Sequence, residues 1–238
     1  MSVPIRSPLT DHCAACQLKS HAFFCDLPKT TMDDFESIKR STAYPAHSLL
    51  FMEGEAPRGI FLLCHGRAKL YMTSAQGKML LLRFADGGEI LGLHAALSNR
   101  PYDATAEVLE PAQVAFVPQA EFLRFLERHA EACLKAARQL SDRCQDAFDQ
   151  MRSIGLAHTA AEKLARLLLE WSSEGHQTPQ GIRVEIHITQ EEIAQLIGSS
   201  RETVNRLFSK FGSESLITLH GSTLLVHNPT ALASLVNT

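Results

Sequence analysis

The sequence predicts an α+β protein in which an antiparallel β-roll is followed by a long helix and a C-terminal winged helix-turn-helix. Three observations support this prediction. Glycine-punctuated apolar runs recur as far as about residue 118, apolar residues then repeat at helical spacing, and two capped helices flank one glycine near the C-terminus. We expect four parts: a cysteine-bearing segment at 1–30, the roll at 31–118, the long helix at 119–155 and the helix-turn-helix domain at 156–238.

Composition restricts the kind of protein and its compartment. The chain has 238 residues, 45% of them hydrophobic and 21% charged, which is typical of a soluble globular protein with one or two domains. No apolar run approaches the ~18 residues of a membrane span, and the first residues lack the apolar core of a signal peptide. We therefore expect a cytoplasmic protein without a membrane partner, whose six cysteines are thiols or ligands.

The N-terminal half begins with a short helix and continues as strands. The segment Thr31–Thr42 has a helix-start signal and places Met32, Phe35 and Ile38 at roughly helical spacing. Beyond it, glycine turns separate short apolar runs at intervals of about 8 to 12 residues, which predicts an antiparallel sandwich or roll. The runs lie at 49–51, 59–66, 69–72 and 79–84.

The long helix presents a regular apolar line. Its members are spaced 4, 3, 4, 3 and 4 residues apart, as at the a and d positions of a coiled coil: Cys133, Ala137, Leu140, Cys144, Ala147 and Met151. One interpretation packs this face against the roll of the same chain. The other pairs two parallel copies of the helix, and therefore predicts a homodimer whose seam is this line.

A helical domain with a hairpin follows the long helix. The segment Thr159–Ser172 is amphipathic, and Ile182–Ile188 predicts a strand after a loop rich in Gly, Gln and Pro. The segment Leu216–His227 predicts two strands about a turn at Gly221 and Ser222. Helices followed by such a hairpin are typical of a winged helix.

Two short helices around a tight turn lie between residues 189 and 211. Thr189 and Glu192 form a capping box, in which hydroxyl and carboxylate each bond a backbone amide. Gly198 can end the first helix because, without a Cβ, it adopts the left-handed conformation at little cost. Ser199 and Glu202 are expected to start the second helix in the same way. The buried stripe of that helix would be Val204, Leu207, Phe208 and Phe211.

The exposed N-terminal turns of the second helix carry the side chains that we expect to contact DNA: Ser200, Arg201, Glu202, Asn205 and Arg206. In a helix-turn-helix these turns lie in the major groove, where an Arg fork matches guanine O6 and N7 and a Glu accepts from cytosine N4. The alternative is a solvated face with intrahelical ion pairs. From residue 153 onward six Lys and Arg oppose eight Glu, so binding would need locally placed cations and two copies acting together.

The roll, the long helix and the winged helix-turn-helix together resemble the CRP/FNR family of bacterial transcription regulators over nearly the whole chain. The sharpest match is Gly198-Ser-Ser-Arg-Glu-Thr-Val-Asn-Arg206, which is similar to the family's recognition signature. The resemblance implies a cyclic-nucleotide-binding-like roll and base contacts from Arg201, Glu202 and Arg206. It also implies a homodimer on palindromic double-stranded DNA, RNA polymerase as a partner, and a TGTGA-like half-site.

The resemblance places an effector pocket in the roll and disfavours cyclic AMP as its ligand. Nucleotide-binding members carry Gly-Glu-Leu and, further on, Arg-Ser, whereas this sequence has Gly92-Leu93-His94 and Tyr102-Asp103 at those places. The cation that would neutralise the cyclic phosphate is therefore replaced, and an acid is added. We expect no cyclic AMP in the pocket that Gly92, Leu93, Tyr102 and Asp103 would form.

Three N-terminal cysteines, Cys13, Cys16 and Cys25, resemble those that hold an oxygen-labile [4Fe–4S] cluster in FNR-like members. Thiolates are soft ligands for iron, and a C-x2-C pair reaches one metal from a single turn. FNR-like members take a fourth ligand from a roll strand, where this sequence has Ala115, so a substitute would be needed from Cys64, His12, Asp11 or Asp26. Three interpretations stay open: unliganded or packed thiols, iron–sulfur ligands, and a Cys13/Cys16 disulfide switch or zinc site.

Other classes of function compete with a regulator controlled by a redox, oxygen, nitric oxide or small-molecule signal. One is an effector-binding roll that acts through protein contacts, and another is a constitutive regulator independent of cyclic nucleotides. A third is a thiol-disulfide exchange enzyme using Cys13 and Cys16. The sequence contains no nucleophile-elbow, zinc-protease, P-loop or dinucleotide-binding motif, and we expect no enzymatic activity.

Overall fold

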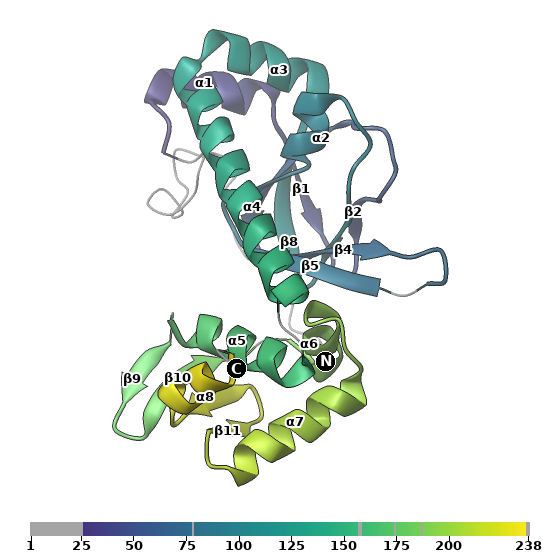
Figure 1. The fold of residues 1–238 in the computed structure, drawn as a ribbon. Helices are drawn as coiled ribbons and strands as arrows, with labels where there is room; N and C mark the ends of the chain where they lie inside the picture. Colours follow the sequence, from purple (N-terminus) through teal and green to yellow (C-terminus); the bar gives the residue numbers. More distant parts are fainter. Residues whose placement is uncertain (1–25, 78, 157–158, 174, 187, 237–238) are drawn as a thin grey trace, which may run out of the picture. The chain divides into compact units, whose positions relative to one another are not determined.

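The computed structural model describes residues 26–77, 79–156, 159–173, 175–186 and 188–236. It has the predicted α+β architecture, with a first compact unit that ends at Cys144 and a second that contains Met79–Leu81 and the residues from Gln145 onward. Each unit combines helices with a small number of short strands (Figure 1). Within the described ranges, no helix is both long enough and apolar enough to cross a bilayer.

The first unit is a roll of two four-stranded sheets, with strand orders β1-β8-β3-β6 and β2-β7-β4-β5. The predicted glycine-punctuated runs form strands in both sheets. The elements are α1 (Lys29–Ile38), β1 (Arg40–Tyr44), β2 (Leu49–Phe51), β3 (Gly59–His65), β4 (Ala68–Thr73), β5 (Met79–Ala85), β6 (Ile90–Leu91), α2 (Leu93–Ser98), β7 (Thr105–Val108), β8 (Ala112–Pro118), α3 (Gln119–Arg128) and α4 (Ala130–Leu156). Helix α4 continues from this unit into the second one.

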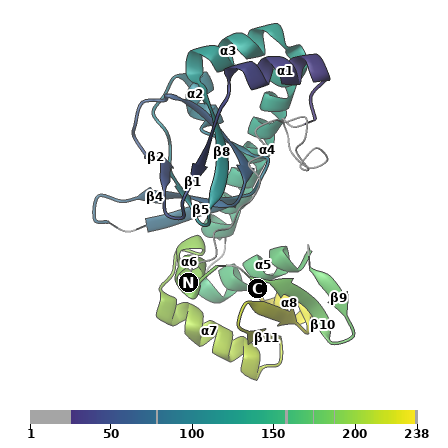
Figure 2. The same cartoon turned by 180° about the vertical axis from the view of Figure 1, so that it is seen from behind.

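Residues 60–63 of strand β3 are all apolar and buried, and both faces of the strand are covered there. Ile60 and Leu62 point to one side, where α1, α3 and α4 pack on the sheet, and Phe61 and Leu63 point to the other, between the two sheets. Figures 1 and 2 show α1 and α3 side by side at one end of the roll, with α4 running along it. The roll therefore has two apolar cores that share this strand.

Two helix predictions in this unit were wrong in their boundaries. The helix expected through Thr42 ends at Ile38, because residues from Arg40 onward pair as β1 with β8, Arg40 opposite Phe116. The single helix expected at 119–155 is broken at His129, whose φ of −123° and ψ of 90° are extended. The break changes the direction of the chain, so that α3 and α4 each bury an apolar face on the same roll. The sequence also did not predict α2.

The second unit is a helical domain with a four-stranded antiparallel sheet of order β11-β12-β10-β9. The strand expected at 182–188 is β10, which is shorter, and the short β9 and the terminal α8 were not predicted. The elements are α5 (Ala160–Ser173), β9 (His176–Thr178), β10 (Gly181–Glu185), α6 (Gln190–Leu196), α7 (Arg201–Ser213), β11 (Ile217–His220), β12 (Thr223–Val226) and α8 (Pro229–Val236). One core joins these helices to one face of the sheet, and includes Leu168, Val204, Phe211 and Leu224.

Candidate nucleic-acid interface

Helix α6 begins with the predicted capping box. The Thr189 hydroxyl accepts from the Glu192 amide at 3.2 Å, and the Glu192 carboxylate accepts from the Thr189 amide at 2.7 Å. Ile193 and Ala194 are buried immediately behind this cap, which fixes α6 in the core of the domain. After the helix, Gly198 has a φ of 64°, the left-handed conformation that its lack of a side chain permits. The turn between α6 and α7 is thus set by local chemistry.

The N-cap of α7 is Ser200, and the prediction of Ser199 was wrong by one residue. The Ser200 hydroxyl accepts from the Thr203 amide at 3.2 Å, and its backbone is extended with φ −96° and ψ 154°. The Ser199 amide instead donates to the Ala194 carbonyl at 2.8 Å, so Ser199 belongs to the turn that closes α6. The shift leaves Arg201 and Glu202 as the first two residues of the helix.

Helix α7 has one buried face and one exposed face. The predicted stripe is confirmed, since each of its members is at most 8% exposed: Val204, Leu207, Phe208 and Phe211. The residues predicted to contact DNA all lie on the exposed side: Ser200, Arg201, Glu202, Asn205 and Arg206. In the part of the chain that the structure describes, neither Arg201 nor Arg206 forms an ion pair, so the intrahelical pairing that would explain them as a solvated face is not formed.

The Glu202 carboxylate is held in its ionised form. A hydrogen bond from its own backbone amide lowers the pKa of Glu202, and the Ser200 hydroxyl and the charge of Arg201 lower it further. At neutral pH, Glu202 is therefore a hydrogen-bond acceptor beside the Arg201 donor fork. An acceptor and a donor fork side by side on an exposed helix turn suit the edges of a cytosine and a guanine.

Helix α4 has a roll-facing side and an exposed apolar side. Ala132, Ala136 and Gln139 are buried against the roll, and Leu140 also packs against that core. By contrast Phe148 is 55% exposed and Met151 is 59% exposed. The exposed apolar line has spacings of 3, 4, 3, 4 and 3 and consists of Leu134, Ala137, Ser141, Cys144, Phe148 and Met151. Sequence reasoning missed Leu134 and Phe148, although the same heptad spacing contains them.

In the roll, the residues predicted to form an effector pocket lie close together. Gly92 has a φ of 75°, and a Cβ there would meet the Tyr102 ring at 2.8 Å. The Tyr102 side chain is only 2% exposed, stacks on Phe51 at 4.1 Å, and donates its hydroxyl proton to the Gly59 carbonyl at 2.8 Å. Tyr102 therefore fills space inside the roll.

The remaining pocket residues differ in exposure. Leu93 is buried at the start of α2, whereas Asp103 is exposed and its carboxylate lies 2.6 Å from His94 Nδ1. At the two positions where the resemblance implies Arg-Ser, the chain therefore has a buried aromatic ring, Tyr102, and an exposed acid, Asp103.

The three predicted cysteine ligands, Cys13, Cys16 and Cys25, lie outside the described residues. The described ranges contain no group of three or more His, Cys, Asp or Glu that could hold a metal. Ala115 is fully buried in β8 and offers no ligand atom there. The other cysteines do not cluster: Cys64 is half-buried on β3, and Cys133 and Cys144 are exposed on α4. Of the substitutes considered for a fourth ligand, Cys64 and Asp26 lie among the described residues, and the Asp26 carboxylate is paired with Lys135 at 3.1 Å.

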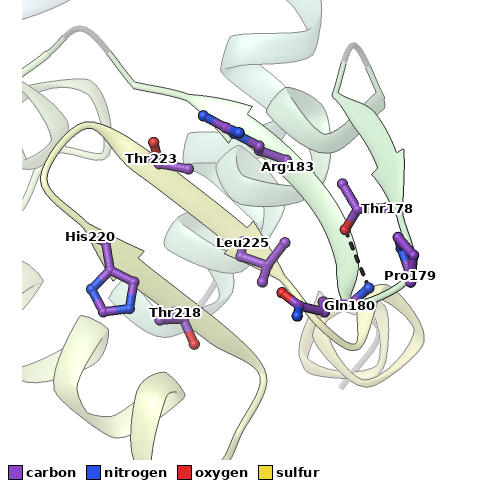
Figure 3. A pocket seen from close by; sticks show the side chains of 8 residues that line it. All are labelled: Thr178, Pro179, Gln180, Arg183, Thr218, His220, Thr223 and Leu225. Atoms are coloured by element: carbon purple, nitrogen blue, oxygen red, sulfur yellow. Dashed lines mark hydrogen bonds between the residues drawn. The ribbon is translucent and has the colours of Figure 1, made fainter.

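An open hollow of about 320 Å³ lies on the face of the β11-β12-β10-β9 sheet opposite the core (Figure 3). Its one cation, Arg183, is bound to Glu185 at 2.7 Å. The hollow includes none of the residues that the sequence singled out. It is lined by Thr178, Pro179, Gln180, Arg183, Thr218, His220, Thr223 and Leu225.

Known proteins resemble both units of the chain. Residues 162–235 match the Crp-like helix-turn-helix domain, and residues 41–129 match the cyclic nucleotide-binding domain. The chain is 30% identical over 210 residues to the transcriptional activatory protein AadR of Rhodopseudomonas palustris, which covers 86% of this chain and 84% of that protein. It is 23% identical over 198 residues to the cAMP-activated global transcriptional regulator CRP of Salmonella typhimurium, covering 83% of this chain and 94% of CRP.

Solved structures share the fold at low sequence identity. A CooA mutant from Carboxydothermus hydrogenoformans superposes with a TM-score of 0.73 at 22% identity, covering 84% of this chain and 88% of CooA. FixK2 from Bradyrhizobium japonicum has a TM-score of 0.70 at 19% identity, covering 83% and 97%. A roll of the cyclic-nucleotide-binding fold joined to a helix-turn-helix defines a DNA-binding transcription regulator. The chain belongs to the CRP/FNR family of such regulators.

Proposed function

We propose that this regulator binds a palindromic operator as a homodimer, with one α7 helix in the major groove of each half-site. The observation that carries this proposal is the exposed face of α7, where Arg201, Glu202 and Arg206 lie opposite the buried stripe. Neither arginine has an ion-pair partner among the described residues, and the Glu202 carboxylate is ionised. Two donor forks and one acceptor are the groups that read G·C pairs.

The homodimer in this proposal is formed by the exposed apolar line of α4. A helix that is buried on one side by its own roll and apolar on the other lacks a partner for its second face. The proposed seam differs from the line expected from the sequence. Its central position is Ser141 and not Leu140, because Leu140 packs on the roll. Leu134 and Phe148 replace Cys133 and Ala147, and Ala137, Cys144 and Met151 remain.

The signal in this proposal is not cyclic AMP. The roll has the matching domain fold, but Tyr102 fills the place expected for the phosphate-binding arginine, and Asp103 adds a negative charge beside it. We propose instead that the cysteines Cys13, Cys16 and Cys25 make the protein responsive to redox state or oxygen, either as cluster ligands or as thiols. AadR is by name an activator, and RNA polymerase is the partner that we propose for activation in the cytoplasm.

Base recognition is tested by measuring the affinity of three variants for a palindrome of TGTGA half-sites and for a scrambled duplex. Arg201→Ala and Glu202→Ala should each weaken cognate binding by about 1–3 kcal/mol and relax discrimination at one base position. The matched control is Lys210→Ala, which removes an exposed cation from the far end of the same helix. If all three variants change cognate and scrambled binding alike, α7 does not read the sequence.

The signal is tested by purifying the protein without oxygen and measuring its visible spectrum, iron and sulfide. Stoichiometric sulfide that is lost in Cys13→Ser and Cys25→Ser would support a cluster at these residues. A colourless protein whose DNA affinity changes with thiol oxidation would support a disulfide switch. Saturable binding of cyclic AMP with a rise in operator affinity would contradict the proposed role of Tyr102 and Asp103.

A further inference from the structure

A cluster of four polar side chains joins α1 to the corner between α3 and α4. We call it the corner cluster, and it consists of Thr31, Asp34, His129 and Glu131. Figures 1 and 2 show that α1 lies beside α3 at this end of the roll. His129 Nε2 lies 2.9 Å from Asp34 Oδ2, and His129 Nδ1 lies 3.3 Å from the Thr31 hydroxyl, which itself donates to Glu131.

The hydrogen-bond pattern of the corner cluster is complete only when both ring nitrogens of His129 donate. The bond from Thr31 lowers the pKa of Glu131, so at neutral pH the Glu131 carboxylate only accepts. Because the single hydroxyl proton of Thr31 goes to Glu131, its oxygen can only accept from His129 Nδ1. The Asp34 carboxylate likewise only accepts from Nε2. Both ring nitrogens must therefore donate, which requires the imidazolium.

A neutral His129 cannot complete this pattern in either tautomer. With the proton on Nε2, the lone pair of Nδ1 faces the lone pair of the Thr31 oxygen. With the proton on Nδ1, the lone pair of Nε2 faces the Asp34 carboxylate. Each tautomer thus loses one contact. Within the described residues, the side-chain bonds that join the His129 ring to α1 are those with Asp34 and Thr31.

Two carboxylates and one aromatic ring surround the His129 side chain. Asp34 faces it from α1, and Glu131 faces it from α4 with Oε1 3.9 Å from Nδ1. The ring of Phe125, on α3, also faces His129, with 4.8 Å between the two ring centroids. In the described residues the ion pairs of His129 are with these two carboxylates, and its side chain is only 15% exposed. These two carboxylates are therefore the charged groups that face the ring.

We propose that the corner cluster is a proton-dependent latch, in which doubly protonated His129 fastens α1 to the start of α4. The latch is complete below the range in which an imidazole loses its second proton and weakens as the pH rises through that range. The attachment of α1 to the corner between α3 and α4 therefore depends on proton concentration. This inference is independent of the proposed function, because neither DNA nor a redox signal is needed to observe it.

Hydrogen exchange of the α1 amides in the full-length protein tests the latch. Protection factors, which correct for the chemical effect of pH on exchange, are compared between about pH 6 and about pH 8. In the wild type, protection of residues 29–38 should be about threefold lower at the higher pH, as expected for a partly exposed charged pair. In His129→Gln the side chain has no titrating proton, so protection should be low at both pH values.

Two further variants make the test specific. Asp34→Asn keeps the shape of an exposed side chain but can donate to a neutral ring, so it should remove most of the pH dependence without unfolding the corner. His47→Gln deletes another histidine–carboxylate pair, at 3.1 Å from Glu107, and should leave α1 with the wild-type profile. A wild-type profile that is flat, or a drop that both His129→Gln and Asp34→Asn retain, would overturn the proposal.

Discussion

Replacing Phe148 with alanine is expected to weaken the proposed homodimer strongly. Phe148 is 55% exposed in the single chain, which for a side chain of about 200 Å² leaves about 110 Å² of mostly apolar surface. At about 25 cal/mol per Å², covering this surface stabilises the dimer by about 2.7 kcal/mol per copy. The dimer contains Phe148 twice, which doubles the expected loss. Alanine retains the Cβ and the ring is not completely buried in the dimer, and both of these reduce the loss. We therefore expect a loss of about 2–4 kcal/mol, or roughly 30- to 1,000-fold in the dimer dissociation constant.

Sedimentation equilibrium of the full-length protein over a range of concentrations measures this constant directly. The control is Leu49→Ala, because Leu49 is 46% exposed but lies on β2 in the roll, away from the apolar line of α4. This variant should dimerise like the wild type. A Phe148→Ala protein that dimerises as tightly as the control would refute the reasoning, and so would a wild type that is monomeric at tens of micromolar. Far-ultraviolet circular dichroism checks that each variant is folded.

Two further predictions concern stability. Tyr102→Phe removes a buried hydroxyl that donates to the Gly59 carbonyl, so the free energy of unfolding should fall by about 1–3 kcal/mol in urea titrations. An unchanged midpoint would mean that this bond contributes nothing. Thr189→Ala removes the hydroxyl that accepts from the Glu192 amide in the α6 capping box and should cost about 1 kcal/mol in thermal unfolding. Thr189→Ser keeps the capping oxygen and should stay close to the wild type, and equal losses in both variants would argue against the cap.

The helix-turn-helix could be predicted almost completely from the sequence because its signals are local. The capping box of Thr189 and Glu192, the left-handed Gly198 and the apolar stripe of α7 each depend on residues a few positions apart. Even the error at Ser199 was a shift of one residue between adjacent serines. Which serine caps the helix depends on the turn, where the Ser199 amide is already used by the Ala194 carbonyl.

The α4 seam could not be assigned in the same way, because two heptad registers fit the same sequence. Leu140 and Phe148 are both apolar at suitable spacings, but Leu140 packs against the core of the roll whereas Phe148 is 55% exposed, and the sequence pattern does not distinguish them. The break at His129 also has no local signal, since no proline or glycine lies there. It follows from tertiary contacts, namely the need of α3 and α4 to cover the same sheet.

The pairing of β1 with β8 has a consequence for the order in which the chain can fold. In the β1-β8-β3-β6 sheet, β8 is the strand that joins β1 to β3, yet it is the last of the four to be synthesised. During translation, β1 and β3 must therefore remain unjoined until about residue 118 has left the ribosome. Such distant pairings slow folding, whereas the C-terminal domain pairs strands that are close in sequence, such as β11 and β12. A nascent chain interrupted before Ala112 would lack the central strand of this sheet and would expose two unpaired strand edges to aggregation.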